Sequence, residues 1–300
     1  MGHAHHHHTH DHSRAFGIGI ALNIIFVCVE FLFGVSSHSL ALLADAGHNF
    51  SDVLALAVAW GAAILSKRIP SERYTYGFRS SSILAGLFNA ILLLVVTGGI
   101  MWASLSRLSH PESVNGRVVT AVALFGFLVN LATALLLRPG HDRDLNVRAA
   151  FFHMAADAAV SLGVALSGIV ILYTGWERLD PGVSLVISAV IVYGTWDLLR
   201  DSMGLALNAV PENIDPAGVK GYFSALSGVS EVHDLHIWGM STTESALTVH
   251  LVMTQGHPGD AWMAKVSEDL HDLFHIEHAT MQIERGDPDY PCILAPEHRV

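Results

Sequence analysis

The sequence is poor in charged residues, and those it has are not predominantly basic. Only 14% of its 300 residues are Asp, Glu, Lys or Arg, whereas soluble proteins contain roughly a quarter. The formal net charge is −11 at pH 7. A nucleic-acid-binding protein needs a positively charged surface to contact the phosphate backbone. This composition therefore excludes nucleic acid as a partner.

Cysteine is scarce as well. The chain has only Cys28, within an apolar run, and Cys292, close to the end of the sequence. A small secreted scaffold held together by disulfides needs a larger set of paired cysteines, so that class is excluded. Histidine, in contrast, is abundant, with 20 residues.

Hydrophobic residues make up 51% of the chain and gather in long runs. A helix needs about 20 mostly apolar residues to cross a hydrocarbon core of roughly 30 Å. Six stretches meet this requirement: Phe16–Ser36, Leu40–Leu65, Ile83–Leu105, Val118–Leu137, Ala149–Tyr173 and Val183–Leu199. We therefore predict an α-helical, multi-pass membrane protein with six transmembrane helices.

The distribution of positive charge predicts how these helices are oriented. Lys and Arg concentrate in the loops that face the cytoplasm. If the N-terminus is inside, nine Lys or Arg residues lie in or next to inside segments and three lie in outside loops. We therefore expect both termini to be cytoplasmic, in the cell membrane, or in the inner membrane if the organism is Gram-negative.

The last part of the chain is different in character. Residues 209–300 hold 4 Lys or Arg and 14 Asp or Glu, whereas residues 1–208 hold 12 and 13. Apolar periodicity predicts helices over 215–226 and 257–274 and strands over 232–239, 246–253 and 279–285. The order αββαβ suits a small two-layer α+β domain. We expect three regions: a His-rich segment (1–14), a transmembrane domain (15–208) and a cytoplasmic domain (209–300).

Two of the predicted spans each carry a histidine and an aspartate four residues apart. An ionisable group within a span costs at least about 2.5 kcal/mol, so it has a functional role by default. His48 and Asp52 lie in the second span, and His153 and Asp157 lie in the fifth. Residues i and i+4 share one face of a helix. If the two faces meet, they supply two nitrogens and two oxygens, a ligand set that Zn2+ favours.

Other polar residues in the spans are open to more than one interpretation. A single His-x-x-x-Asp pair can also serve as a hydrogen-bonded contact between helices. Glu30 and Asp45 fit either a role in the ion or proton pathway or a structural hydrogen bond. The amides of Asn23, Asn89 and Asn130 are expected to join neighbouring helices.

Four segments together resemble the cation diffusion facilitator family of metal exporters, most closely its bacterial zinc, cobalt and cadmium efflux members and the vertebrate zinc transporters. They are Ser39–Asp52 (SLALLADAGHNFSD), Arg73–Arg79 (RYTYGFR) leading into Ile83-Leu-Ala, His153–Asp157 (HMAAD) and Val232–Trp238 (VHDLHIW). The resemblance covers nearly the whole chain.

The resemblance implies a fold, an activity and a site. The family has six spans, a cytoplasmic domain of ferredoxin-like topology and a homodimeric assembly, and it exchanges cytoplasmic metal for protons by alternating access. Its transport site corresponds here to His48, Asp52, His153 and Asp157. His rather than Asp at the first position favours zinc over cadmium. The implied function is zinc-preferring efflux by a secondary transporter, with Co2+ or Cd2+ as further substrates and no organic cofactor.

The loop after the second span departs from the family pattern. Relatives usually have an acidic residue before the Ile-Leu-Ala run, and this chain has Ser82. Some relatives bind metal in this loop, but Lys67–Arg79 contains no His, Cys or Asp. We predict no metal site there.

A second metal site is expected in the cytoplasmic domain. His233 and His250 lie on the two neighbouring predicted strands, where they can face each other. The family resemblance adds Glu284 as a ligand, and Cys292 as a thiolate can complete the set. Zn2+ bound there would regulate transport by stiffening the dimer. We expect the other histidines His257, His271, His275 and His298 to be surface residues.

The N-terminal twelve residues contain seven histidines. The segment is either an expression tag or a tract that collects metal weakly near the cytoplasmic entrance. We expect it to be dispensable for transport.

Three other functions compete with zinc–proton exchange. An intramembrane zinc hydrolase needs an open coordination position and a general base, and the sequence has no His-Glu-x-x-His motif. A passive channel needs weak binding and not four ligands. A sensor without transport does not explain ligands within the spans.

Overall fold

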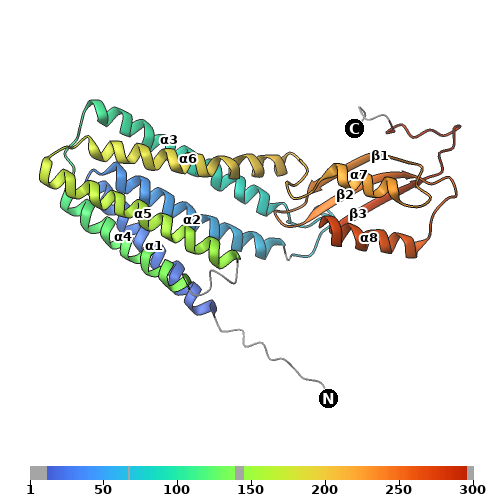
Figure 1. Ribbon diagram of the computed structural model, residues 1–300, viewed down its shortest axis with the longest axis horizontal. Coiled ribbons are helices and arrows are strands. Elements are labelled where there is room, and N and C mark those ends of the chain that lie inside the picture. The colour runs from blue at the N-terminus through green and yellow to red at the C-terminus, as the bar shows by residue number, and fades with distance from the viewer. Residues whose placement is uncertain (1–11, 67, 139–144, 296–300) are drawn as a thin grey trace, which may run out of the picture. The chain divides into compact units, whose positions relative to one another are not determined.

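The computed structural model of the protein describes residues 12–66, 68–138 and 145–295. Long helices make up the first two thirds of this part (Figure 1). They are α1 (His12–Ser36), α2 (Leu40–Ser66), α3 (Ser81–Ser109), α4 (Gly116–Leu137), α5 (Leu145–Thr174) and α6 (Leu179–Ala206). Each of the six predicted spans lies within one of these helices.

Most of these helices have the length and the apolar surface of membrane spans. Within the described residues, the stretches Ser81–Ser109, Gly116–Leu135, Phe151–Thr174 and Leu179–Ala206 are long and apolar enough to cross a bilayer, and Ile24–Ser36 of α1 is a shorter apolar helix. Large apolar side chains such as Trp102 are exposed on the helices (77%). Lipid, and not water, suits such a surface. The prediction of a helical membrane domain is confirmed.

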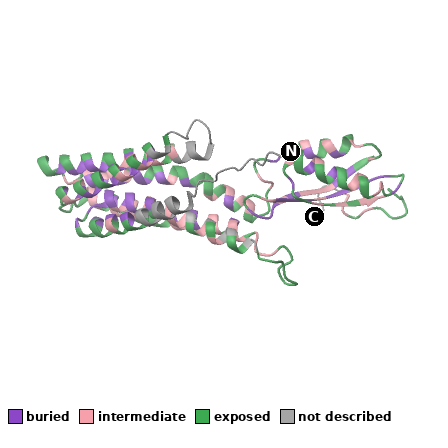
Figure 2. Ribbon diagram, turned by 90° about the horizontal axis from the view of Figure 1, so that it is seen from below, coloured by how far each residue is buried: buried purple, intermediate pink, exposed green. Residues whose placement is uncertain are grey.

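The chain forms two compact units. One comprises residues 1–57 and 89–197, and the other comprises residues 58–88 and 198–300. In the first unit, small and branched apolar residues are buried between the helices, among them Ala41, Val119, Ala123 and Val164. Figure 2 shows the buried positions on the inner sides of the helices.

Glycines allow α4 and α5 to approach closely. A Cβ on Gly168 of α5 would lie 2.6 Å from Thr120 Oγ1, and one on Gly116 of α4 would lie 2.6 Å from the carbonyl oxygen of Gly168. Small residues at such contacts are typical of helix packing in membranes, where dispersion forces and not the hydrophobic effect hold helices together. The position of α5, which carries half of the predicted transport site, therefore depends on residues without a side chain.

The second unit contains a small α+β domain. Its elements are α7 (Pro216–Ala225), β1 (Glu231–Gly239), β2 (Ser245–Val252), α8 (Asp260–Phe274) and β3 (His278–Glu284). The sheet order is β1-β2-β3, with β1 antiparallel to β2 and β2 parallel to β3. The predicted αββαβ order is confirmed.

The helices cover an apolar face of this sheet. Phe223 of α7, Leu247 of β2 and Leu270 of α8 are fully buried in one cluster. Asp215 begins α7 as its N-cap, because its carboxylate accepts the N–H groups of Ala217 and Gly218. The helix predicted from residue 257 begins only at Asp260, since the preceding Gly259 has a φ of 97° that a helix does not allow.

The start of α3 contacts the turn between β1 and β2 within this second unit. Arg79 Nη1 lies 3.1 Å from Glu244 Oε2, and Ser80 donates to the carbonyl oxygen of Met240. Ser82 accepts the N–H of Thr242 at 3.1 Å. The residue that departs from the family pattern thus has a specific partner here.

Candidate metal centres

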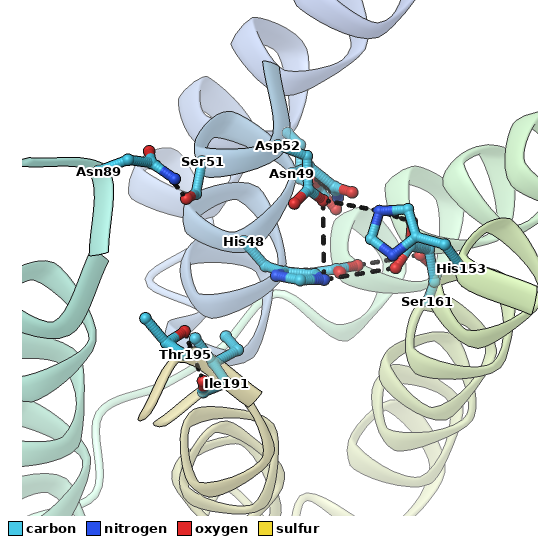
Figure 3. Close-up of polar contacts among 12 residues, drawn as sticks. His48, Asn49, Ser51, Asp52, Asn89, His153, Ser161, Ile191 and Thr195 are labelled. Carbon is cyan, nitrogen blue, oxygen red and sulfur yellow. Dashed lines mark hydrogen bonds and ion pairs between the residues drawn. The ribbon is translucent and has the colours of Figure 1, made fainter. Parts of the chain in front are cut away.

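The paired residues of α2 and α5 meet in the first unit (Figure 3). His48 Nε2 lies 3.4 Å from Asp157 Oδ1, and His153 Nε2 lies 3.3 Å from Asp52 Oδ2. The contacts within each helix are slightly longer, at 3.7 Å for His48–Asp52 and 3.6 Å for His153–Asp157. Every imidazole therefore faces both carboxylates, its own and that of the other helix.

These separations match those of ligands around one zinc ion. In a tetrahedral site with bonds of about 2.0–2.2 Å, two ligand atoms lie about 3.3–3.6 Å apart. The four nitrogen–oxygen distances between the histidines and aspartates run from 3.3 to 3.7 Å. His48, Asp52 and Asp157 are therefore close enough to share one ion, and His153 has to move nearer to the other three to complete the set.

The four residues are not equally enclosed. The Asp157 side chain is only 3% exposed, while that of His153 is 44% exposed. Ligand atoms of His48, Asp52 and Asp157 all lie within 4.8 Å of one another, and His153 joins this set through its contacts with the two carboxylates. Asp157 Oδ2 is buried and has no hydrogen-bond partner among the described residues. A bound cation would satisfy it.

Two further acidic residues lie in the same unit, and both side chains are fully buried. Glu30 of α1 accepts a hydrogen bond from the Asn49 amide at 3.2 Å, and Asp45 of α2 accepts one from the Ser161 hydroxyl at 3.0 Å. Neither belongs to the cluster of metal-ligating atoms found in this unit. Glu30 and Asp45 therefore accept hydrogen bonds from Asn49 and Ser161 and are not part of the set of four paired residues.

The predicted helix-joining amides have different outcomes. Asn89 of α3 accepts the hydroxyl of Ser51 of α2 at 3.3 Å, which confirms a contact between helices. The Nδ2 of Asn130 is buried and has no hydrogen-bond partner among the described residues. The structure does not describe the side chain of Asn23.

Sequence reasoning missed one buried carboxylate, Asp180, at the start of α6. It accepts the hydroxyl of Ser39 and the backbone N–H groups of Leu40 (2.7 Å) and Ala41 (3.4 Å). It thereby caps the first turn of α2, the helix that carries half of the predicted transport site. An aspartate in the first turn of an apolar helix was the available signal.

The second cluster lies on the sheet of the C-terminal α+β domain. His233 of β1 and His250 of β2 are partners in the antiparallel ladder, as predicted. Glu284, at the end of β3, lies 3.3 Å from His233 Nε2 and 3.0 Å from His250 Nδ1. Cys292 Sγ lies 3.5 Å from His250 Nδ1. One ligand atom from each of the four residues lies within 4.8 Å of all the others.

Further carboxylates lie behind the two imidazoles. Asp234 Oδ2 lies 3.4 Å from His250 Nε2, the nitrogen that points away from Glu284, and Glu231 Oε1 lies 3.4 Å from His233 Nδ1. Asp234 takes this position at an irregularity in the β1–β2 register, with a φ of 49°. Asp234 is also hydrogen-bonded to His236, whose Nε2 lies 3.0 Å from Asp234 Oδ1, and His233 Nδ1 has no hydrogen-bond partner among the described residues. A carboxylate that does hydrogen-bond to a ligating histidine fixes its tautomer and orientation.

Protonation of the two non-histidine groups follows from their surroundings. Desolvation alone would raise the pKa of Glu284, but hydrogen bonds from Gln282 and Cys292 and the nearby imidazoles outweigh it and hold this pKa below its usual value. Burial raises the pKa of the Cys292 thiol, and the adjacent Glu284 carboxylate raises it further. Metal binding by Cys292 therefore has to displace a proton.

The remaining histidines differ from these two sets. His257, His271 and His275 are exposed, as predicted. His298 and residues 1–11, which hold most of the N-terminal histidines, lie outside the described residues.

Comparisons with known proteins agree on one family. Residues 17–205 match the cation efflux transmembrane domain, and residues 211–286 match the cation efflux protein cytoplasmic domain. The chain is 35% identical to the metal cation efflux system protein CzcD of Cupriavidus metallidurans, over 91% of this chain and 85% of that protein. It is 37% identical to the zinc transporter ZitB of Escherichia coli (86% and 83%) and 31% identical to a cadmium, cobalt and zinc/H(+)-K(+) antiporter of Bacillus subtilis (86% and 85%).

Proposed function

The chain belongs to the cation diffusion facilitator family of metal exporters, and we propose that it moves Zn2+ out of the cytoplasm in exchange for protons. It is a multi-pass membrane protein and a secondary transporter, not an enzyme. Relatives named zinc transporters support zinc as the preferred cation, and relatives named for cobalt and cadmium support Co2+ and Cd2+ as further substrates.

The observation that carries this proposal is the convergence of His48 and Asp52 on α2 with His153 and Asp157 on α5. The set offers two imidazole nitrogens and two carboxylates, whose charges neutralise a divalent cation where water is scarce. All four positions would act as zinc ligands. The exposed side of His153 would give the ion a way into the site.

Exchange with protons follows from the chemistry of the ligands. Imidazole and carboxylate groups bind metal only when deprotonated, so protons and zinc compete for the same atoms. If the site opens to one side of the membrane at a time, zinc leaves where protons enter. A relative named as a cadmium, cobalt and zinc/H(+)-K(+) antiporter supports such coupling.

The orientation and the domain boundaries are part of the proposal. The excess of Lys and Arg in alternate loops supports cytoplasmic termini, in the cell membrane, or in the inner membrane of a Gram-negative organism. The domain matches support a transmembrane domain over residues 15–208 and a cytoplasmic domain over residues 209–300, preceded by a His-rich segment over residues 1–14.

The cytoplasmic domain would act as a regulator and as the dimer contact. The matched family of cytoplasmic domains is named for dimerisation, which supports a homodimer. Zinc held by His233, His250, Glu284 and Cys292 would join two strands, the end of a third and the C-terminal segment. Bound metal would make this domain more rigid and favour transport. If a His233→Ala/His250→Ala double variant keeps an unchanged zinc activation, this regulatory role is wrong.

Zinc uptake into inverted membrane vesicles tests the main proposal. An imposed pH gradient, acidic inside, should drive zinc into the vesicles against its own gradient, and a protonophore should abolish this accumulation. A channel would only equilibrate zinc, and a sensor or hydrolase would move none. Accumulation that persists at full rate after the pH gradient is collapsed would rule out proton coupling.

A further inference from the structure

Glu30 and Asp45 form a buried acidic pair that the metal site does not use. Glu30 belongs to α1 and Asp45 to α2, and the exposed fraction of both side chains is 0%. Their carboxyls lie within hydrogen-bonding reach of each other. In the part of the chain that the structure describes, no Lys or Arg forms an ion pair with either residue.

Each carboxyl has one oxygen with a donor and one without. The Asn49 amide donates to Glu30 Oε2, and the Ser161 hydroxyl donates to Asp45 Oδ2. The other two oxygens, Glu30 Oε1 and Asp45 Oδ1, are buried and find no hydrogen-bond donor among the described residues. Two orphaned oxygens on adjacent acids need an explanation, because nearly all buried polar atoms in proteins are paired.

A single shared proton would give both unpaired oxygens a hydrogen-bond partner. Two ionised carboxylates in contact, out of water and without a cation, repel each other and lose their hydration. If one acid is protonated on its free oxygen and donates to the free oxygen of the other, both orphaned atoms are satisfied. The pair then has a single negative charge and four oxygens with partners.

We propose that Glu30 and Asp45 share one proton in this conformation and so form a proton-binding site separate from the zinc ligands. The titratable groups that face the pair are His48 on α2 and Asp157 on α5. Among the described residues, no ion pair joins either acid to these two groups. The assignment of a transport role to this proton rests on the zinc–proton exchange proposed above.

The partners of the pair connect it to the metal site. Asn49 follows the ligand His48 directly in α2, and Ser161 lies one helical turn beyond the ligand Asp157 in α5. Figure 3 labels Asn49 on the helix that carries His48 and Ser161 on the helix that carries His153. A shift of α2 against α5 when zinc binds or leaves would change the hydrogen bonds that hold the shared proton. The pair is therefore placed to take up or release a proton during transport.

Infrared spectroscopy of the full-length protein, purified in lipid and freed of metal with a chelator, tests this assignment. A buried protonated carboxyl gives a C=O stretching band that an ionised carboxylate lacks. The Glu30→Gln and Asp45→Asn variants should each lose this band completely, although each removes only one acid. In either variant the new amide can donate to the remaining carboxylate, which no longer needs the proton.

The matched control is Asp180→Asn. Asp180 is also fully buried, but its carboxylate already accepts one hydroxyl and two N–H groups, so this variant should leave the band unchanged. A band that persists at half its intensity in each single variant would mean two independent protons, and no band in the wild type would mean none. Either result overturns the proposal. Since no zinc is present, such a failure is independent of whether the protein transports zinc.

Discussion

The two candidate metal centres use similar residues but are built in different ways. In the membrane domain, two helices each supply a histidine and an aspartate at positions i and i+4. In the cytoplasmic domain, three strands and the C-terminal segment each supply one ligand, and strand register brings them together. The first centre needs only two helices to face each other. The second needs an entire sheet.

Their surroundings differ as well. Among the described residues, His48 Nδ1 of the first centre and both ring nitrogens of His233 of the second are buried without a hydrogen-bond partner, whereas His250 Nε2 faces Asp234 at 3.4 Å. A carboxylate behind a ligating histidine makes it a stronger metal ligand. If the first centre is the transport site it has to release its ion in every cycle, and if the second is regulatory it has to keep it. On the proposed roles, the carboxylate near His250 would favour retention.

The largest expected effect comes from removing a membrane ligand. Asp157→Ala deletes the carboxylate that lies closest to His48 and is almost fully enclosed, so zinc uptake into inverted vesicles should fall to background. The matched control is Asp197→Ala, which removes an exposed aspartate from α6 and should retain uptake. If Asp157→Ala keeps more than about half of the wild-type rate, the membrane centre is not the transport site.

A smaller effect is expected behind the cytoplasmic ligands. Asp234→Asn removes the charge that lies 3.4 Å from His250 Nε2, and loss of a group that supports a metal ligand typically costs 10–100-fold in metal affinity. Competition with a zinc chelator should show this loss for the cytoplasmic site, while uptake through the membrane site persists. As a control, Asp272→Asn removes the exposed partner of His271 and should leave the affinity unchanged. If the wild type and the Asp234→Asn variant bind zinc with equal affinity, Asp234 does not distinguish the cytoplasmic centre from the membrane centre.

The zinc affinity of the cytoplasmic site should depend on pH through the protonation of the Cys292 thiol. Because burial and Glu284 raise the pKa of Cys292, the thiol is protonated at neutral pH and must lose its proton to bind zinc. Zinc affinity should therefore increase by about tenfold per pH unit between about pH 7 and 8.5, beyond the usual range of histidine titration. Zinc affinity measured at several pH values should no longer increase in this way in the Cys292→Ser variant. An unchanged slope in that variant would exclude Cys292 as a ligand.

The smallest effect is expected where the start of α3 contacts the β1–β2 turn. Arg79 and Glu244 form an ion pair whose side chains are 37% and 35% exposed. Exposed ion pairs of this kind contribute about 0.2–1 kcal/mol to stability. Glu244→Gln should therefore change zinc uptake by less than about twofold. A loss as large as that of Asp157→Ala would show that this contact is a third functional centre.

Much of the membrane domain was predictable because its signals are local. The six apolar runs lie within α1 to α6, and the histidine–aspartate spacing places each pair on one face of a helix. Each predicted strand end of the C-terminal domain lies within one residue of the observed end. The prediction that His233 and His250 face each other is also confirmed. The start of α8 was predicted too early because Pro258 and Gly259 were read as part of the helix.

The residues that sequence reasoning missed act over long separations. Asp180 caps a helix 140 positions earlier in the chain, and Ser161 donates to Asp45 across 116 positions. The place of Asp234 behind His250 depends on an irregular register and a φ of 49°. No periodicity encodes such contacts, because they arise only when separate elements pack.

The order of residues by itself determined which segments are apolar enough for a bilayer, which helix faces hold paired ligands and which strands the acidic domain contains. These properties depend on solvation and on the repeat of a helix or strand, which act within a few residues. The packing of distant segments sets three further features: α2 and α5 face each other at ligand distance, Glu30 lies against Asp45, and Asp234 lies near His250. Those outcomes depend on how closely helices and strands approach, which is set by packing over the whole of each unit.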